Sequence, residues 1–98
     1  MSDAAEEQAW HQSDAVIRDE TGLHARPAVR LTKLAKQFAA RVEIRADGHE
    51  NWVNAKSPNA VMKLKASHDS RLNIRAAGDD AEAAVAALAG LVDRNFDD

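Results

Sequence analysis

The sequence has no cysteine, no long apolar run and no block of basic residues. Without cysteine the chain cannot form disulfide bonds or thiolate metal sites. Nowhere does it approach the roughly 20 consecutive apolar residues that a transmembrane helix needs. The opening MSDAAEEQAW has neither the basic start nor the apolar stretch of a signal peptide. We therefore expect a cytoplasmic protein that does not act at a membrane.

Acidic residues outnumber basic residues by 16 to 13, for a formal net charge of -3. A general nucleic-acid-binding protein usually carries a clustered basic surface, so this function is not expected. Proteins or small anions are the expected partners. The length of 98 residues is enough for one small domain with a single core.

The first 12 residues are small, polar and acidic apart from an isolated Trp10, and they predict a disordered tail. The folded domain is expected over 13–98. Its first segment, Ala15 to Asp19, contains adjacent β-branched residues and stops at the Thr21-Gly22 break. This pattern predicts a first strand.

Three segments carry helix signals. From Pro27 onward, one helical stripe is formed by Leu31, Leu34, Ala35 and Phe38. Ser57 and Pro58 predict the N-cap and first position of a second, short helix, whose apolar turn runs over 61–64. Asp79 and Glu82 form a variant of the capping box ahead of a third helix. The apolar stripe of that helix is Val85, Leu88, Ala89 and Val92.

Three further segments are typical of strands. Residues 42–46 alternate apolar and charged side chains, Asp47-Gly48 supplies a turn, and 51–54 can return as the second strand of a hairpin. Residues 72–76 alternate in the same way. The predicted order is βαββαβα, an α+β fold in which a four-stranded antiparallel sheet has all three helices on one face and solvent on the other.

This layout places His24 between the end of a strand and the start of a helix. Unpaired amides and the positive end of the helix dipole favour an anion there, such as a phosphoryl group. A neutral imidazole is a nucleophile near neutral pH, and a phosphoryl group bonded to it stays reactive. Arg26 can donate to phosphoryl oxygens, and Pro27 restricts the backbone of the first helical turn.

Each of these residues also has a simpler interpretation. His24 can be a surface residue or a cap, Arg26 a solvated side chain, and Pro27 an ordinary helix starter. His49 and His68 lie in polar turns without the spacing of a metal site. The basic residues at 26, 30, 33, 36, 63 and 65 either form a solvated face or steer acidic partners.

Two segments together resemble one protein family. GLHARPA, from Gly22 to Ala28, resembles the active-site signature of HPr, the histidine-containing phosphocarrier of the bacterial phosphoenolpyruvate-dependent phosphotransferase system. VNAKS, followed by VMKL, covers 53–64 and resembles the segment around that family's regulatory serine. The resemblance implies an open-faced β-sandwich, phosphorylation of His24, charge stabilisation by Arg26, and a phosphoryl-binding loop that includes Ala25 and Pro27.

By the same resemblance the chain is a relay protein rather than an enzyme, is expected to be a monomer and carries no metal or cofactor. The implied phosphoryl donor is enzyme I, the acceptor is an enzyme IIA domain, and a dedicated HPr kinase/phosphorylase can act on Ser57. Pro58, Asn59 and Ala60 depart from the family's apolar, glycine-containing pattern, so partner docking is expected to be altered, as in a specialised paralogue. A pure interaction module, or a regulatory domain controlled by Ser57, remains an alternative.

Overall fold

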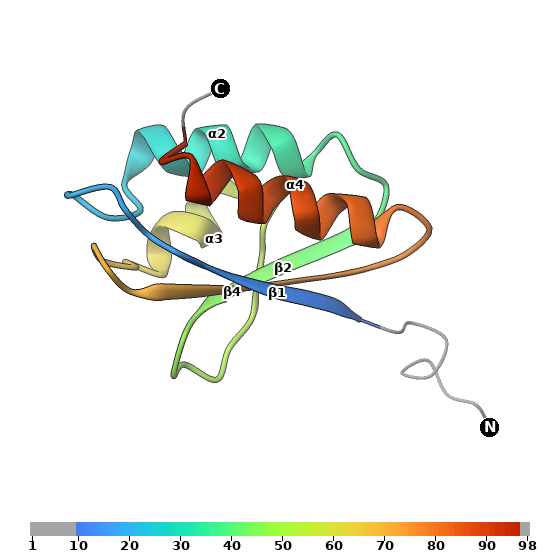
Figure 1. The fold of residues 1–98 in the computed structure, drawn as a ribbon, viewed down its shortest axis with the longest axis horizontal. Helices are drawn as coiled ribbons and strands as arrows, with labels where there is room; N and C mark the ends of the chain where they lie inside the picture. The colour runs from blue at the N-terminus through green and yellow to red at the C-terminus, as the bar shows by residue number, and fades with distance from the viewer. Residues whose placement is uncertain (1–9, 97–98) are drawn as a thin grey trace.

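The computed structural model describes residues 10–96, and its elements follow the predicted order βαββαβα (Figure 1). They are β1 (His11–Val16), α2 (Ala25–Ala35), β2 (Arg41–Ala46), β3 (Val53–Asn54), α3 (Pro58–Lys63), β4 (Arg71–Ala77) and α4 (Ala81–Asp93). The strands form one 4-stranded sheet in the order β1-β4-β2-β3, and every pairing is antiparallel. The predicted fold class is confirmed.

The three helices lie on the same side of the sheet, with α2 and α4 side by side (Figure 1). The core fills the space between these layers, because alternate residues of β2 and β4 and the apolar stripes of α2 and α4 point into it. Its largest fully buried side chains include Ile17, Leu31, Ile44, Leu72, Ile74, Leu88 and Leu91.

The first strand begins earlier than predicted. It covers His11–Val16 instead of Ala15–Asp19 and pairs with β4 from His11↔Ala76 to Val16↔Arg71. Pairing with a neighbouring strand, which is a tertiary property, therefore decides its bounds. The strand also takes in the last two residues of the predicted tail, while 1–9 lie outside the described residues. The hairpin is confirmed, although β3 has only 2 residues.

The predicted capping box of the last helix is wrong. The N-cap of α4 is Asp80, and its side chain makes no cap hydrogen bond. The Asp80 carboxylate instead accepts the backbone amides of Ala39 and Ala40, at 2.9 and 2.8 Å. The bond from the Ala39 amide is the main reason why the pKa of Asp80 is lowered. This side chain thus joins the start of α4 to the loop before β2.

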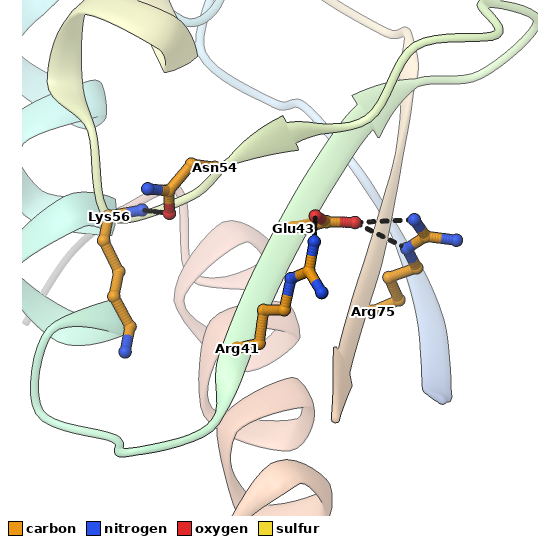
Figure 2. Close-up of polar contacts among 5 residues, drawn as sticks. All are labelled: Arg41, Glu43, Asn54, Lys56 and Arg75. Carbon is orange, nitrogen blue, oxygen red and sulfur yellow. Dashed lines mark hydrogen bonds and ion pairs between the residues drawn. The ribbon is translucent and has the colours of Figure 1, made fainter. Parts of the chain in front are cut away.

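The sheet face opposite the helices, predicted to face solvent, carries ion pairs and cation–π contacts between its side chains. Arg75 donates from Nε and Nη2 to the same oxygen of Glu43, and Arg41 approaches the other oxygen (Figure 2). The Arg75 guanidinium also lies 4.0 Å from the ring centroid of Trp10 and 4.2 Å from that of Trp52. Trp10, expected in the tail, therefore belongs to this face, where cation–π contacts cover the strands.

Candidate functional site

The loop between β1 and α2 is held by its glycine. Gly22 has φ +80, and a Cβ at this position would lie 2.5 Å from the carbonyl oxygen of Ala66. The next residue, Leu23, is buried and donates its amide to that same oxygen at 2.8 Å. Only glycine satisfies both the positive φ and the close approach of the two backbones. This contact sets the position from which His24 enters the helix.

His24 is the N-cap of α2, as its place in the sequence predicts. Its backbone is extended, with φ -92 and ψ -164, and its side chain makes no cap hydrogen bond. The first helical bond runs from the Ala28 amide to the His24 carbonyl, so the amides of Ala25 and Arg26 have no acceptor within the helix. The His24 side chain is 42% exposed. An exposed imidazole thus stands beside an open helix N-terminus, where an anion is stabilised.

Pro27 lies in the first turn of α2, as predicted, and is its third residue because the helix begins at Ala25. The amide of a third helical residue has no intrahelical acceptor. A proline in this first turn therefore costs no hydrogen bond. Its ring is fully buried, which anchors the exposed turn to the core.

Asp19 is a site residue that the sequence prediction missed. Its Oδ1 accepts both the backbone amide and the hydroxyl of Thr21, each at 2.8 Å. The same oxygen lies 3.4 Å from Nε2 of His24. The Thr21 hydroxyl, followed by its amide, holds the pKa of the Asp19 carboxyl below its usual value. The detectable signal was the spacing Asp19-x-Thr21, which is typical of a carboxylate that bonds the backbone two residues ahead.

Basic side chains lie on both sides of the histidine. Arg26 is exposed and lines a polar groove with Asp19, Arg30 and Arg94. His24 itself lines a separate shallow hollow, which Lys65 also borders. The structure therefore places Arg26 near the start of α2, but the grooves lined by the arginine and by the histidine are different.

Ser57 caps α3, as predicted. Its hydroxyl accepts the amide of Ala60 at 3.3 Å, and Pro58 occupies the first helical position. The side chain is partly buried, and the short helix packs against α2. The structure thus assigns Ser57 a local structural contact and leaves its phosphorylation a prediction.

Within 10–96, no group of three or more His, Cys, Asp or Glu side chains could hold a metal ion. His68 makes a 3.4 Å contact with its neighbour Asp69. No helix in that part of the chain is both long and apolar enough to span a membrane.

The fold and this site define a class of protein: a small open-faced β-sandwich with an exposed histidine at the start of its first helix. The family described as "PTS HPr component phosphorylation site" matches residues 11–94. The chain therefore belongs to the HPr family of phosphocarrier proteins, which act in the phosphotransferase system.

Individual relatives agree with this assignment. The phosphocarrier protein HPr of Haloferax volcanii is 44% identical over 69 residues, covering 70% of this chain and 78% of the relative. The multiphosphoryl transfer protein of Vibrio cholerae is 40% identical over 79 residues, which span 80% of this chain but only 20% of that longer protein.

Solved structures show the same fold. HPr-C-His from Thermoanaerobacter tengcongensis has a TM-score of 0.80 at 35% identity and covers 88% of this chain and 94% of its own. Crh, the Bacillus subtilis catabolite repression HPr, has a TM-score of 0.62 at 35% identity, with 84% and 95% covered.

Proposed function

We propose that this phosphocarrier receives its phosphoryl group on His24 from enzyme I, with phosphoenolpyruvate as the ultimate donor, and passes it to an enzyme IIA domain in the cytoplasm. The proposal rests on the exposed imidazole of His24. This ring lies at the N-terminus of α2, which its side chain does not cap. Membership of the family supports the reaction class. The similarity to part of a multiphosphoryl transfer protein supports a role among several phosphoryl-transfer domains.

The transfer step needs a nucleophile and stabilisation of charge, and the site offers both. The unprotonated ring nitrogen of His24 attacks phosphorus, and the bond from phosphorus to the donor atom breaks with its electrons staying on the donor. The free amides of Ala25 and Arg26 and the Arg26 guanidinium are suited to the phosphoryl oxygens. Pro27 holds this turn against the core. The reverse sequence of bond changes delivers the group to the acceptor.

A second candidate function is regulation through Ser57. The similarity to Crh, a catabolite repression HPr, favours it, as does the position of the hydroxyl at a helix start beside α2. Phosphorylation by an HPr kinase/phosphorylase would replace the cap with a dianion on this surface. Such a charge repels an acidic partner and lowers transfer to His24.

Incubation with enzyme I and phosphoenolpyruvate, followed by intact mass measurement, tests the proposal. We expect the addition of one phosphoryl group that is lost in acid, as a phosphohistidine is. A phosphate on serine would survive the same acid treatment. The acid step therefore distinguishes phosphorylation of His24 from phosphorylation of Ser57. Absence of any mass increase with active enzyme I would contradict the proposed transfer reaction.

A further inference from the structure

We propose that Asp19 is a positioning residue that keeps the proton of the neutral His24 ring on Nε2, so that Nδ1 carries the lone pair that attacks phosphorus. This inference rests on the proposed function of His24. The geometry that carries it is the 3.4 Å approach of the Asp19 carboxylate to Nε2. A neutral imidazole has one N–H and one lone pair, and the partner of one nitrogen decides which form is present.

Asp19 is itself held in place, which a positioning residue requires. The two bonds from Thr21 converge on Oδ1, the oxygen that faces His24. The backbone supports the same turn, because the Gly22 amide donates to the Asp19 carbonyl at 2.9 Å. The carboxylate is only 24% exposed. Its orientation is therefore set before a phosphoryl donor arrives.

The carboxylate also favours the transfer step itself. As the bond from Nδ1 to phosphorus forms, the ring gains positive charge, while Nε2 keeps its proton and its contact with Asp19. The attraction between carboxylate and ring therefore grows toward the transition state, which lowers the barrier. When the group moves on, electrons return to Nδ1 and the ring is neutral again. Nε2 keeps its proton both when His24 accepts the phosphoryl group and when it donates the group.

Other charged groups at the site do not replace this contact. Lys65 borders the hollow that His24 lines, and Arg26 follows on α2. Both are cations without an acceptor atom, so neither can accept a hydrogen bond from Nε2–H. Glu20 is exposed and adjacent to Asp19 in the sequence, and among residues 10–96 it makes no hydrogen bond or ion pair with His24. Glu20 thus provides a matched control carboxylate in the same loop.

The alternative role of Asp19 is purely structural, as the residue that closes the turn with Thr21. Asp19→Asn separates the two roles, because the amide oxygen can still accept from Thr21 while the negative charge is removed. Asp19→Ala removes both functions. Glu20→Gln removes one charge from the loop and leaves the Asp19 contact intact.

The experiment measures the ring ¹⁵N chemical shifts of His24 in the unphosphorylated wild type and the three variants, at a pH where the ring is neutral. We expect the Nε2–H form to dominate in the wild type and Glu20→Gln. Its population should fall in Asp19→Asn, whose neutral amide oxygen is a weaker acceptor, and should fall furthest, to the mixture of solvated imidazole, in Asp19→Ala. Transfer from enzyme I should slow by about 10-fold in both Asp19 variants, by analogy with the lower end of the effect of removing the partner of a metal-binding histidine. Melting temperatures should stay close to wild type for Asp19→Asn.

Unchanged tautomer populations in both Asp19 variants would overturn the inference. A rate loss confined to Asp19→Ala would also overturn it, because only the turn would then matter. The tautomer is read without any phosphoryl donor, so a wild type that fails to accept phosphate contradicts the proposed function separately.

Discussion

The N-termini of α2 and α3 are alike in sequence, but they differ in whether a side chain caps their free amides. Each has a polar residue as N-cap and a proline in its first turn, and both helices lie on the same face of the sheet. At α3 the cap residue, Ser57, uses its hydroxyl to accept a helix amide. At α2 the side chain of His24 caps nothing and remains exposed. One helix start is closed by its own side chain, and the other is open to an external anion.

The difference shows how function is distributed between two similar elements. A helix start is stabilised when a side chain satisfies its free amides, usually by about 1 kcal/mol. Forgoing that bond at α2 leaves amide donors and the dipole for a ligand. The stability of this turn comes instead from the buried ring of Pro27 and the backbone contact of Leu23 with Ala66. The uncapped N-terminus of α2 is therefore tolerated because these neighbouring contacts hold the turn in place.

Replacing His24 should have the largest effect, because it removes the phosphoryl acceptor from the N-terminus of α2. In His24→Ala the start of α2 keeps its geometry but has no ring nitrogen, so phosphoryl acceptance from enzyme I should fall to zero in an intact-mass assay. The melting temperature should hardly change, since the side chain is exposed and caps nothing. Acid-labile phosphorylation of this variant would show that another residue is the acceptor.

Replacing Arg26 removes positive charge from the uncapped N-terminus of α2. Arg26→Ala should slow transfer by about 10- to 100-fold, because charge on the phosphoryl oxygens is then less well stabilised in the transition state. Rapid-quench measurements at saturating enzyme I separate this rate from docking. Lys36→Ala, at the other end of the same helix, is the charge-matched control. An effect on apparent affinity alone would reduce Arg26 to a docking role.

A negative charge at the N-terminus of α3 tests whether Ser57 influences phosphoryl transfer to His24. Ser57→Asp should reduce transfer to His24 by roughly 3- to 10-fold through repulsion of an acidic partner, while the helix N-terminus accepts the charge and the fold persists. Asn51→Asp adds the same charge in the β2–β3 hairpin and should leave the rate unchanged. Equal rates for Ser57→Asp and wild type would limit Ser57 to its capping contact.

The smallest effect is expected from removing that cap. Ser57→Ala should lower the free energy of unfolding by about 1 kcal/mol, because the Ala60 amide loses its acceptor. Transfer to His24 should continue at the wild-type rate. Urea denaturation provides the stability, and the same quench assay provides the rate. A larger loss of transfer than of stability would assign Ser57 a direct part in the reaction.

Much of the fold was predictable because its signals are local. Apolar periodicity located α2 and α4, and the Ser57-Pro58 pair located α3. The Asp47-Gly48 turn located the hairpin between β2 and β3. The failures involve long-range contacts. Asp79 was expected to cap α4, yet the N-cap is Asp80, and the Asp80 carboxylate accepts the amides of Ala39 and Ala40, which lie 41 and 40 residues earlier in the sequence. Trp10 was assigned to a tail because nothing near it in sequence shows that Arg75 covers its ring.

The local chemistry follows from the sequence alone: a histidine before a helix, a glycine two residues earlier, and a serine whose hydroxyl reaches an amide three residues ahead. These features depend on neighbours along the chain, so spacing reveals them. The close approach of Gly22 to Ala66, and the position of the Asp19 carboxylate beside Nε2 of His24, depend on the folded structure. Those contacts depend on how the loop folds back on itself and against a distant segment, because a side chain's direction in a loop is set by the surfaces that surround it.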